Sequence, residues 1–533
     1  MLCAFRRPEA SQLKPALRVV SIATTVRARR RIARDARSCS SGDCCNCKPS
    51  WRSDSLGADK SPEMPQSISL LLSRMGEPPF QGSVGFVNNA IPPLLQRHGW
   101  DVRPFPPPAP AAMEETMLPF GLAGLFARQC EHGLADVALH DSIGAALRFP
   151  SRQWARRNVV LHHGLAYGAG AWLANPEIDL HCANSPYLAR VLRALLAFPD
   201  WRHRRCLDPR AFDVVTDVRL PVPCVVDPDG SPLLGHGMDI SPALQRLLDG
   251  PLVLGHALQP GKQDWIATLS VLYCLNQLAR GHGTPPVKLL VADASLDAEQ
   301  RRQLDAMLAP TGTCCADYLI PLPHLNQRAL FRLMRTCRFG LAYNRFPEPF
   351  GFYVLESVHN GCPVYTNGVG NNRFLLPAEH GLVVHETPAM AAPSTGPALY
   401  GAVAETIHAD LARPEAMRAA CRRGGALIAQ TWSPAAFEQD LRAALERVER
   451  PLPEPPAFDA LEVALSPLVR SLDFVSGHLL SDYASGVLDP ASRTLAQRLL
   501  GQRCGDLDGG EMSRIEAAHG FFRRGILTLA PVA

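Results

Sequence analysis

The segment Phe-Pro-Glu-Pro-Phe-Gly-Phe-Tyr-Val-Leu-Glu at 346–356 holds the residues whose types and spacing best suit chemistry. It places Glu348 and Glu356 eight positions apart across a turn rich in proline and glycine. A helix that starts after this turn offers backbone N–H groups without an intrahelical partner, and such groups bind phosphate. Carboxylates beside them suit hydroxyl groups, which donate charge-assisted hydrogen bonds. The segment therefore predicts a site for a ligand that carries both phosphate and sugar hydroxyls.

A simpler interpretation is that the prolines and Gly351 form an ordinary loop and that both glutamates are solvated, as acidic residues near helix starts often are. The sequence that follows favours a site. A glycine turn and a strand-like run, Gly-Cys-Pro-Val-Tyr at 361–365, lead into a second glycine-rich turn, Asn-Gly-Val-Gly-Asn-Asn at 367–372. His-Gly-Leu-Val-Val at 380–384 comes next. These runs predict a β-rich segment and a second glycine-rich turn, so strand, turn and helix follow one another in this half of the chain.

The elements that must position these residues alternate between strands and helices. Strands are predicted over 68–72, 100–105, 135–139, 158–162, 252–256, 287–292, 318–322 and 339–343, and helices over 86–97, 264–278, 296–308, 326–338 and 353–358. Ser185 and Pro186 predict the N-cap and first position of one more helix. Such alternation implies right-handed crossovers and parallel sheets. A second domain is expected to start near Pro251, and the proline-rich stretch 451–456 closes it.

This order of elements and motifs resembles glycosyltransferase family 4, whose donor site carries an E-x7-E element followed by a Gly-Pro-Val strand and a glycine-rich loop. The resemblance covers roughly residues 67–445. It implies an α/β GT-B fold, with two Rossmann-like doubly wound parallel-sheet domains that face each other across a cleft, plus a helical C-terminal appendage. We expect a disordered basic, cysteine-rich extension at 1–64, an acceptor domain at 65–248, a nucleotide-sugar domain at 249–450 and a helical extension at 451–533.

The resemblance implies roles for the residues of the donor side. Glu356 would accept hydrogen bonds from the ribose, and Glu348 would hold hydroxyls of the transferred sugar. The backbone amides of Phe350, Gly351 and Phe352 would meet the diphosphate. Asn371 and Asn372 could contact sugar or phosphate, or could serve only the geometry of their own turn.

Further residues are implied on the loops that follow other strands. Lys262 would bind the donor phosphates, and His256 stands where the family carries an arginine. Gly82 and Gly85 resemble the family's first glycine loop, near the diphosphate, in Gly-Ser-Val-Gly. His163, in His-His-Gly at a strand end, would lie near the anomeric carbon. His140 and Asp141 end another strand and match a less specific position; a structural role for these histidines stays open.

Composition bounds the class of protein. The 533 residues, 47% hydrophobic and 20% charged, suffice for two or three ordinary globular domains. Residues 1–50 carry eleven Lys or Arg against three acidic residues, so the overall charge of +4 leaves −4 for residues 51–533. That balance argues against a nucleic-acid partner. No run reaches 18 apolar residues, so no membrane span is expected, although peripheral contact with a membrane stays possible.

The cysteines favour a reducing, cytoplasmic compartment. Most are scattered through apolar surroundings, as Cys274 and Cys362 are, where a reduced cysteine is an ordinary core residue. The Cys-Cys-Asn-Cys cluster at 44–47 lacks the second pair of ligands that a zinc finger needs. The resemblance implies no metal and no cofactor, since Lys262 and the backbone amides near Gly351 would bind the donor phosphates in their place.

The expected function is that of a retaining, nucleotide-sugar-dependent glycosyltransferase of the hexosyltransferase type. Its partners would be a nucleoside-diphosphate sugar and a glycan, lipid-linked or small-molecule acceptor. Catalysis would depend on Glu348, Lys262 and His163. Two alternatives remain: a catalytically impaired GT-B protein that binds a nucleotide sugar or glycan, and a nucleotide-sugar epimerase on the same fold.

Overall fold

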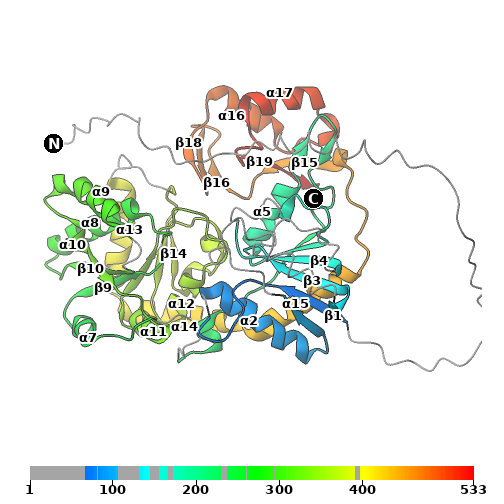
Figure 1. Ribbon diagram of the computed structural model, residues 1–533. Helices are drawn as coiled ribbons and strands as arrows, with labels where there is room; N and C mark the ends of the chain where they lie inside the picture. Colours follow the sequence, from blue (N-terminus) through cyan, green and yellow to red (C-terminus); the bar gives the residue numbers. More distant parts are fainter. Residues whose placement is uncertain are drawn as a thin grey trace, which may run out of the picture. The chain divides into compact units, whose positions relative to one another are not determined.

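The computed structural model describes residues 66–80, 82–105, 131–143, 155–165, 172–229, 237–259, 261–292, 296–389 and 397–532. They form two six-stranded parallel sheets with their helices, and a C-terminal extension (Figure 1). The predicted extension at 1–64, with its cysteine cluster at 44–47, lies outside the described residues.

The first sheet has the strand order β2-β1-β3-β4-β5-β8, and every neighbouring pair is parallel. Its strands are β1 (Ser67–Leu71), β2 (Asp101–Pro104), β3 (Ala135–Asp141), β4 (Ala155–His162), β5 (Leu180–Ala183) and β8 (Val215–Asp217). Helices α2 (Gly82–Arg97) and α5 (Pro186–Leu196) accompany them, with a small ribbon of β6 (Pro199–Asp200) and β7 (Arg205–Cys206). β1 is buried along its whole length, as parallel strands covered on both faces are.

The second sheet has the order β11-β10-β9-β12-β13-β14 and is also parallel throughout. Its strands are β9 (Val253–Ala257), β10 (Val287–Ala292), β11 (Leu319–Leu322), β12 (Phe339–Ala342), β13 (Val364–Thr366) and β14 (Leu382–Val384). Its helices include α7 (Pro242–Leu248), α8 (Trp265–Gly281), α9 (Ala298–Leu308), α10 (Cys315–Tyr318), α11 (Gln327–Thr336), α12 (Phe352–His359), α13 (Pro397–Leu411) and α14 (Pro414–Thr431). A short helix, α6 (Pro223–Val226), precedes this domain.

The predicted α/β fold of the GT-B type, with two Rossmann-like parallel-sheet domains, is confirmed by these two sheets. The strand predicted over 287–292 coincides with β10, and the helix predicted over 353–358 lies within α12. The helix predicted to begin at 86 instead begins at Gly82, because the Gly-Ser-Val-Gly segment forms its first turn rather than a loop. None of the described helices is both long and apolar enough to cross a membrane.

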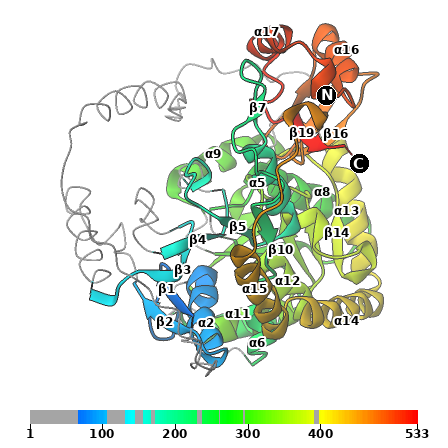
Figure 2. The same ribbon diagram turned by 90° about the vertical axis from the view of Figure 1, so that its right-hand side faces the viewer.

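Helix α15 (Pro434–Glu449) returns from the second domain to the first sheet, beside β4 and β5 (Figure 2). Arg219, just after β8, forms a two-pronged ion pair with Asp440 of this helix, with both contacts at 2.7 Å. Phe437 and Leu441 of α15 share one apolar core with strands of the first sheet and with α12 of the second domain. The two domains are therefore joined by packed side chains as well as by the chain.

The C-terminal extension is not helical throughout, and this part of the prediction was wrong. It contains helices α16 (Pro490–Leu499) and α17 (Gly509–His519), but also five strands. These are β15 (Leu461–Leu465), β16 (Val469–Leu472), β17 (His478–Ser481), β18 (Ser485–Val487) and β19 (Leu527–Pro531). β15 and β19 pair antiparallel, and β16, β17 and β18 form a separate antiparallel sheet. The extension shares an apolar core with α5, where Trp201 packs between Phe458 and Phe522.

Candidate functional site

The loops that carry Lys262 and Glu348 leave the second sheet where its strand order reverses. β9 and β12 are neighbours in the sheet, although β10, β11 and the four α-helices α8 to α11 separate them in the described part of the chain. In open parallel sheets, ligands bind outside the carboxyl ends of the strands at such a switch point. Lys262 follows β9 and Glu348 follows β12. The topology therefore brings both residues to one edge of the sheet.

Lys262 and Glu348 form an ion pair, with 2.8 Å between Lys262 Nζ and Glu348 Oε2. The glutamate side chain is 6% exposed, whereas the lysine side chain is 47% exposed. Asn344 Nδ2 donates to the same carboxylate oxygen at 3.3 Å, and Arg345 N donates to Lys262 O at 2.8 Å. The pair thus joins a firmly held acceptor for hydroxyls to a flexible cation that can turn toward phosphate.

The glycine-rich turn after β13 supports the loop of Glu348. Glu348 and Gly370 form an isolated parallel bridge, in which Asn371 N donates to Glu348 O at 2.7 Å. Asn371 Nδ2 donates to Phe350 O at 2.6 Å, and Asn372 is also buried. The structure thus engages the Asn371 amide in holding the loop. A direct contact of either asparagine with a ligand stays a prediction.

Helix α12 begins beside this loop. Gly351 is its N-cap residue and has no side chain that could cap the first-turn N–H groups. These groups are therefore suited to an anion. Phe350 is buried and its ring packs 4.4 Å from that of Phe352, so the side chain of Phe350 holds the helix start in place.

The first domain touches the second at Pro349. Ser185, the N-cap of α5, donates from Oγ to Pro349 O at 2.5 Å. A Cβ built on Gly164 would lie 3.4 Å from Pro349 Cγ. Because Gly164 follows His163 directly, the strand end that carries this histidine lies beside the loop that carries Glu348.

His163 is held in its neutral form. Its Nε2 lies 3.1 Å from Asn88 Oδ1, and Asn88 Nδ2 donates to Asp141 Oδ2 at 2.7 Å. Burial lowers the pKa of His163 to about 4, although the Asp141 carboxylate acts in the opposite direction. Because Asn88 Nδ2 donates to Asp141, Asn88 Oδ1 must accept a hydrogen bond from His163 Nε2. The imidazole therefore carries its proton on Nε2 and its lone pair on Nδ1. A neutral imidazole can orient a hydroxyl group but cannot supply a permanent charge.

His140 and Asp141 lie inside the first domain. Asp141 accepts from Ser73 N at 2.5 Å and from Ser73 Oγ at 2.6 Å, which joins the end of β3 to the loop after β1. His140 Nε2 lies 3.2 Å from Asn158 Oδ1, and burial lowers the pKa of His140 to about 4. Both residues thus hold strands and loops together at the carboxyl edge of the first sheet.

The predicted glycine loop forms the first turn of α2. Gly82 is exposed at the helix start, whereas Gly85 is buried, and a Cβ at Gly85 would lie 3.3 Å from Arg74 O. Gly85 thus permits close packing of α2 on the loop after β1. A contact of either glycine with a diphosphate stays a prediction.

The structure does not place His256 at the ligand edge. The residue is fully buried in β9, with Nδ1 2.8 Å from Tyr353 Oη and Nε2 3.1 Å from Ser357 Oγ. Burial lowers its pKa to about 3. His256 therefore joins the sheet to α12 as a neutral residue and has no ring nitrogen left for a phosphate.

Glu356 lies one turn into α12 and is half-buried, close to Cys224 of α6. Its carboxyl group forms no hydrogen bond within the described part of the chain. Burial raises the pKa of Glu356 to about 8. The Glu356 carboxyl group can therefore accept a hydrogen bond from a ligand, or donate one to it, beside the predicted nucleotide-sugar site.

We expect Glu356→Gln to stabilise the protein at alkaline pH. The folded protein holds a proton on Glu356 that the unfolded chain releases near its ordinary pKa of about 4.3, so wild-type stability falls as the pH rises from there to about 8. Glutamine has no such proton. The variant should match the wild type near pH 4 and gain at least about 1 kcal/mol at pH 8.5 in denaturant unfolding. The exposed Glu405→Gln is the control; parallel pH curves for wild type and Glu356→Gln would contradict the expectation.

Sequence reasoning missed three residues that shape the site. Asn344 binds the Glu348 carboxylate, and its place just after β12 is a signal that could have found it. Asp482, in the extension, and Arg373, directly after the glycine-rich turn, hold that turn in place. No local pattern marks their pairing, because Asp482 lies 109 residues away from Arg373 in the chain. Among the described residues, no group of three or more potential metal ligands is gathered together.

No protein-family model matches the chain, and no curated protein matches it. Its fold is similar to solved structures of low sequence identity. Sucrose-phosphate synthase from Thermosynechococcus elongatus is 15% identical, with a TM-score of 0.47 over 72% of this chain and 99% of that one. A glycosyltransferase from Rickettsia africae ESF-5 is 12% identical, with a TM-score of 0.48 over 73% and 100%. HepE from Anabaena, in complex with UDP and glucose, is 16% identical, with a TM-score of 0.44 over 72% and 99%. The fold itself is defined by the strand orders of the two parallel sheets.

Proposed function

We propose that the chain is a glycosyltransferase that moves a sugar from a nucleoside diphosphate to an acceptor hydroxyl, with retention at the anomeric carbon. The observation that supports this best is the Lys262–Glu348 pair, 2.8 Å apart beside the uncapped start of α12. A cation and free amides suit a diphosphate, and a buried carboxylate suits sugar hydroxyls. The acceptor would be a glycan, a lipid-linked molecule or a small molecule.

Donor binding would exchange partners within the ion pair. The Lys262 side chain would turn from Glu348 to a phosphate oxygen, which its exposure and its flexible stem permit. The hydroxyls of the sugar would then donate to Glu348, which Asn344 and the glycine-rich turn hold in place. Glu356 would accept from the ribose after losing its proton.

In the transfer, the bond between the anomeric carbon and the phosphate oxygen breaks as a bond to the acceptor oxygen forms on the same face. The proton of the acceptor hydroxyl passes to the leaving phosphate. Lys262 and the first-turn amides of α12 stabilise the charge that grows on that phosphate. His163, neutral at pH 7, would orient the sugar or the acceptor.

A second candidate is a nucleotide-sugar-binding protein without transferase activity. The burial of His256 favours it, because this position supplies no cation and leaves Lys262 to neutralise the diphosphate from its loop. Such a protein would bind the donor but would release no product.

Melting temperatures with a panel of nucleoside diphosphates and their sugars test both candidates. A ligand that binds the folded protein at 100 times its Kd stabilises it by about 2.7 kcal/mol. The transferase should then consume that donor with an acceptor, and nuclear magnetic resonance should show the donor's anomeric configuration in the product.

The Glu348→Gln variant should show a smaller shift in melting temperature with nucleotide sugars than the wild type, and less change with nucleoside diphosphates. Binding without transfer would support the second candidate, an isomerised donor would support an epimerase, and no response to any nucleotide would refute the proposal.

A further inference from the structure

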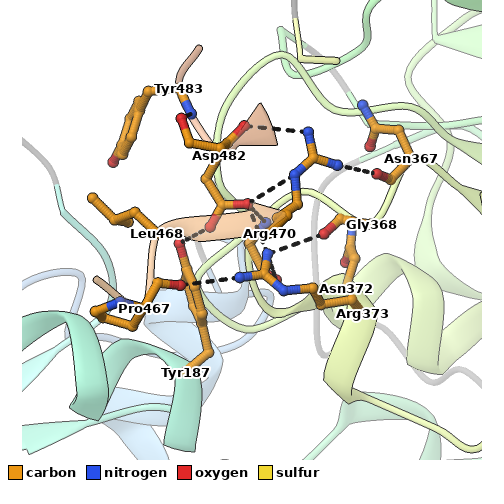
Figure 3. Close-up of polar contacts among 12 residues, drawn as sticks. Tyr187, Asn367, Gly368, Asn372, Arg373, Pro467, Leu468, Arg470, Asp482 and Tyr483 are labelled. Atoms are coloured by element: carbon orange, nitrogen blue, oxygen red, sulfur yellow. Dashed lines mark hydrogen bonds and ion pairs between the residues drawn. The ribbon is translucent and has the colours of Figure 1, made fainter. Parts of the chain in front are cut away.

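One carboxylate of the C-terminal extension contacts both Rossmann-like domains. Asp482 lies between β17 and β18 and its side chain is fully buried (Figure 3). Oδ2 accepts from Tyr187 Oη, on α5 of the first domain, at 2.7 Å. Oδ1 accepts from Gly370 N, in the glycine-rich turn of the second domain, at 3.1 Å, and from Arg373 Nη1, directly after that turn, at 2.7 Å.

Two arginines, each half-buried as a whole residue, complete the attachment of the glycine-rich turn to the extension. Arg373 donates to Gly370 O at 3.1 Å and to Pro467 O, in the extension, at 3.1 Å. Arg470 donates to Asn367 O at 2.8 Å, and its Nε lies 3.7 Å from Asp482 Oδ1. Figure 3 shows both guanidinium groups directed toward Asp482. The Asp482 carboxylate thus lies against two guanidinium groups whose side chains are 9% and 0% exposed.

The same turn holds Glu348 on its other side. Glu348 N donates to Val369 O at 3.4 Å, and Glu348 O accepts from Asn371 N at 2.7 Å. Between them lies Gly370, whose N–H is bound by Asp482. A shift of the backbone at this glycine therefore moves the loop of Glu348 as well.

We propose that Asp482 is a positioning residue for the donor site: it holds the glycine-rich turn, and through that turn Glu348, while Tyr187 couples this support to the first domain. The inference rests on the proposed function for its kinetic consequence only. If Asp482 merely stapled the extension to the core, its loss would lower stability without altering the loop at Glu348.

Two tyrosines offer a matched test. Tyr187 donates to Asp482 at 2.7 Å and Tyr365 donates to Asp410 at 2.8 Å, and both tyrosines are buried. Each Tyr→Phe change removes one hydroxyl and leaves the ring. We expect Tyr187→Phe to speed amide hydrogen exchange in peptides that contain Glu348 and Gly370, and to raise the KM for the donor about tenfold. Tyr365→Phe should do neither.

Asp482→Asn removes the charge and keeps the size. We expect faster exchange at Gly370 and Asn371 in the folded variant, and a larger loss of kcat/KM than in Tyr187→Phe. Unchanged exchange at these amides in folded Asp482→Asn, or equal effects of Tyr187→Phe and Tyr365→Phe, would overturn the inference. Should Asp482→Asn fail to fold, the tyrosine pair alone decides. Amide hydrogen exchange is measured on the protein without a nucleotide sugar. If the wild type binds no nucleotide, the proposed function is refuted, but the exchange test of Asp482 is still valid.

Discussion

Lys262→Ala is expected to lower turnover of a nucleotide sugar by about 100-fold or more. The lysine is the cation of the pair at the switch point, and its Nζ is 2.8 Å from Glu348. In the proposed reaction, negative charge grows on the leaving phosphate, and a positive charge placed beside it stabilises the transition state more than the bound donor. Steady-state kinetics should therefore show a fall in kcat as well as in kcat/KM.

Lys288→Ala is the matched control for this prediction. Lys288 is the other lysine of the described part of the chain, and it donates to Ala316 O at 3.0 Å on an exposed surface. Its removal should leave turnover within about twofold of the wild type, as surface changes usually do. Melting curves should show that Lys262→Ala is folded. A folded Lys262→Ala with wild-type kcat would exclude Lys262 from the chemistry.

Gly370→Ala is expected to abolish turnover and to destabilise the protein by about 2–5 kcal/mol. Gly370 has φ +71°, in the left-handed region, and a Cβ there would lie 2.3 Å from Glu348 N and 2.6 Å from Glu348 O. These contacts are with backbone, so no side-chain movement can relieve them. The loop of Glu348 must move away, and the ion pair with Lys262 must break or shift.

Gly361→Ala separates the effect of a steric clash from the cost of placing alanine at a positive φ. Gly361 has φ +89°, and no atom lies within 4 Å of a Cβ built there. This variant should lose only about 1 kcal/mol in denaturant unfolding and should keep its turnover. If Gly370→Ala and Gly361→Ala behaved alike, contact between the glycine-rich turn and Glu348 would not matter for activity.

The core of the candidate site could be predicted from sequence because its signals are local. An apolar run followed by a glycine or proline turn identifies the carboxyl end of a strand, and Lys262 and Glu348 each follow such a run. Parallel strands send their carboxyl ends to the same edge. Two short patterns, far apart in the chain, thus predict loops on one edge of the sheet, and the structure brings these two side chains to 2.8 Å.

His256 could not be placed in the same way. β9 is covered on both faces, so its sequence lacks the alternation that would tell which face a side chain takes. The histidine ends up against Tyr353 and Ser357 because α12 crosses that face. Which helix covers a strand depends on packing between distant segments, and a strand pattern does not contain that information.

In this chain, the local order of apolar and turn residues determined strands β1 to β4 and β9 to β12 and the loops that carry Lys262 and Glu348, but it did not mark β5, β8 or the helices α13 to α15. Only the tertiary structure decided that β15 pairs with β19, that Asp482 reaches both Tyr187 and the glycine-rich turn, and that Gly370 touches Glu348. The reason is physical. Backbone periodicity acts over a few neighbouring residues, whereas these contacts join segments far apart in the chain and form because burial and charge neutralisation outweigh the entropy lost in bringing them together.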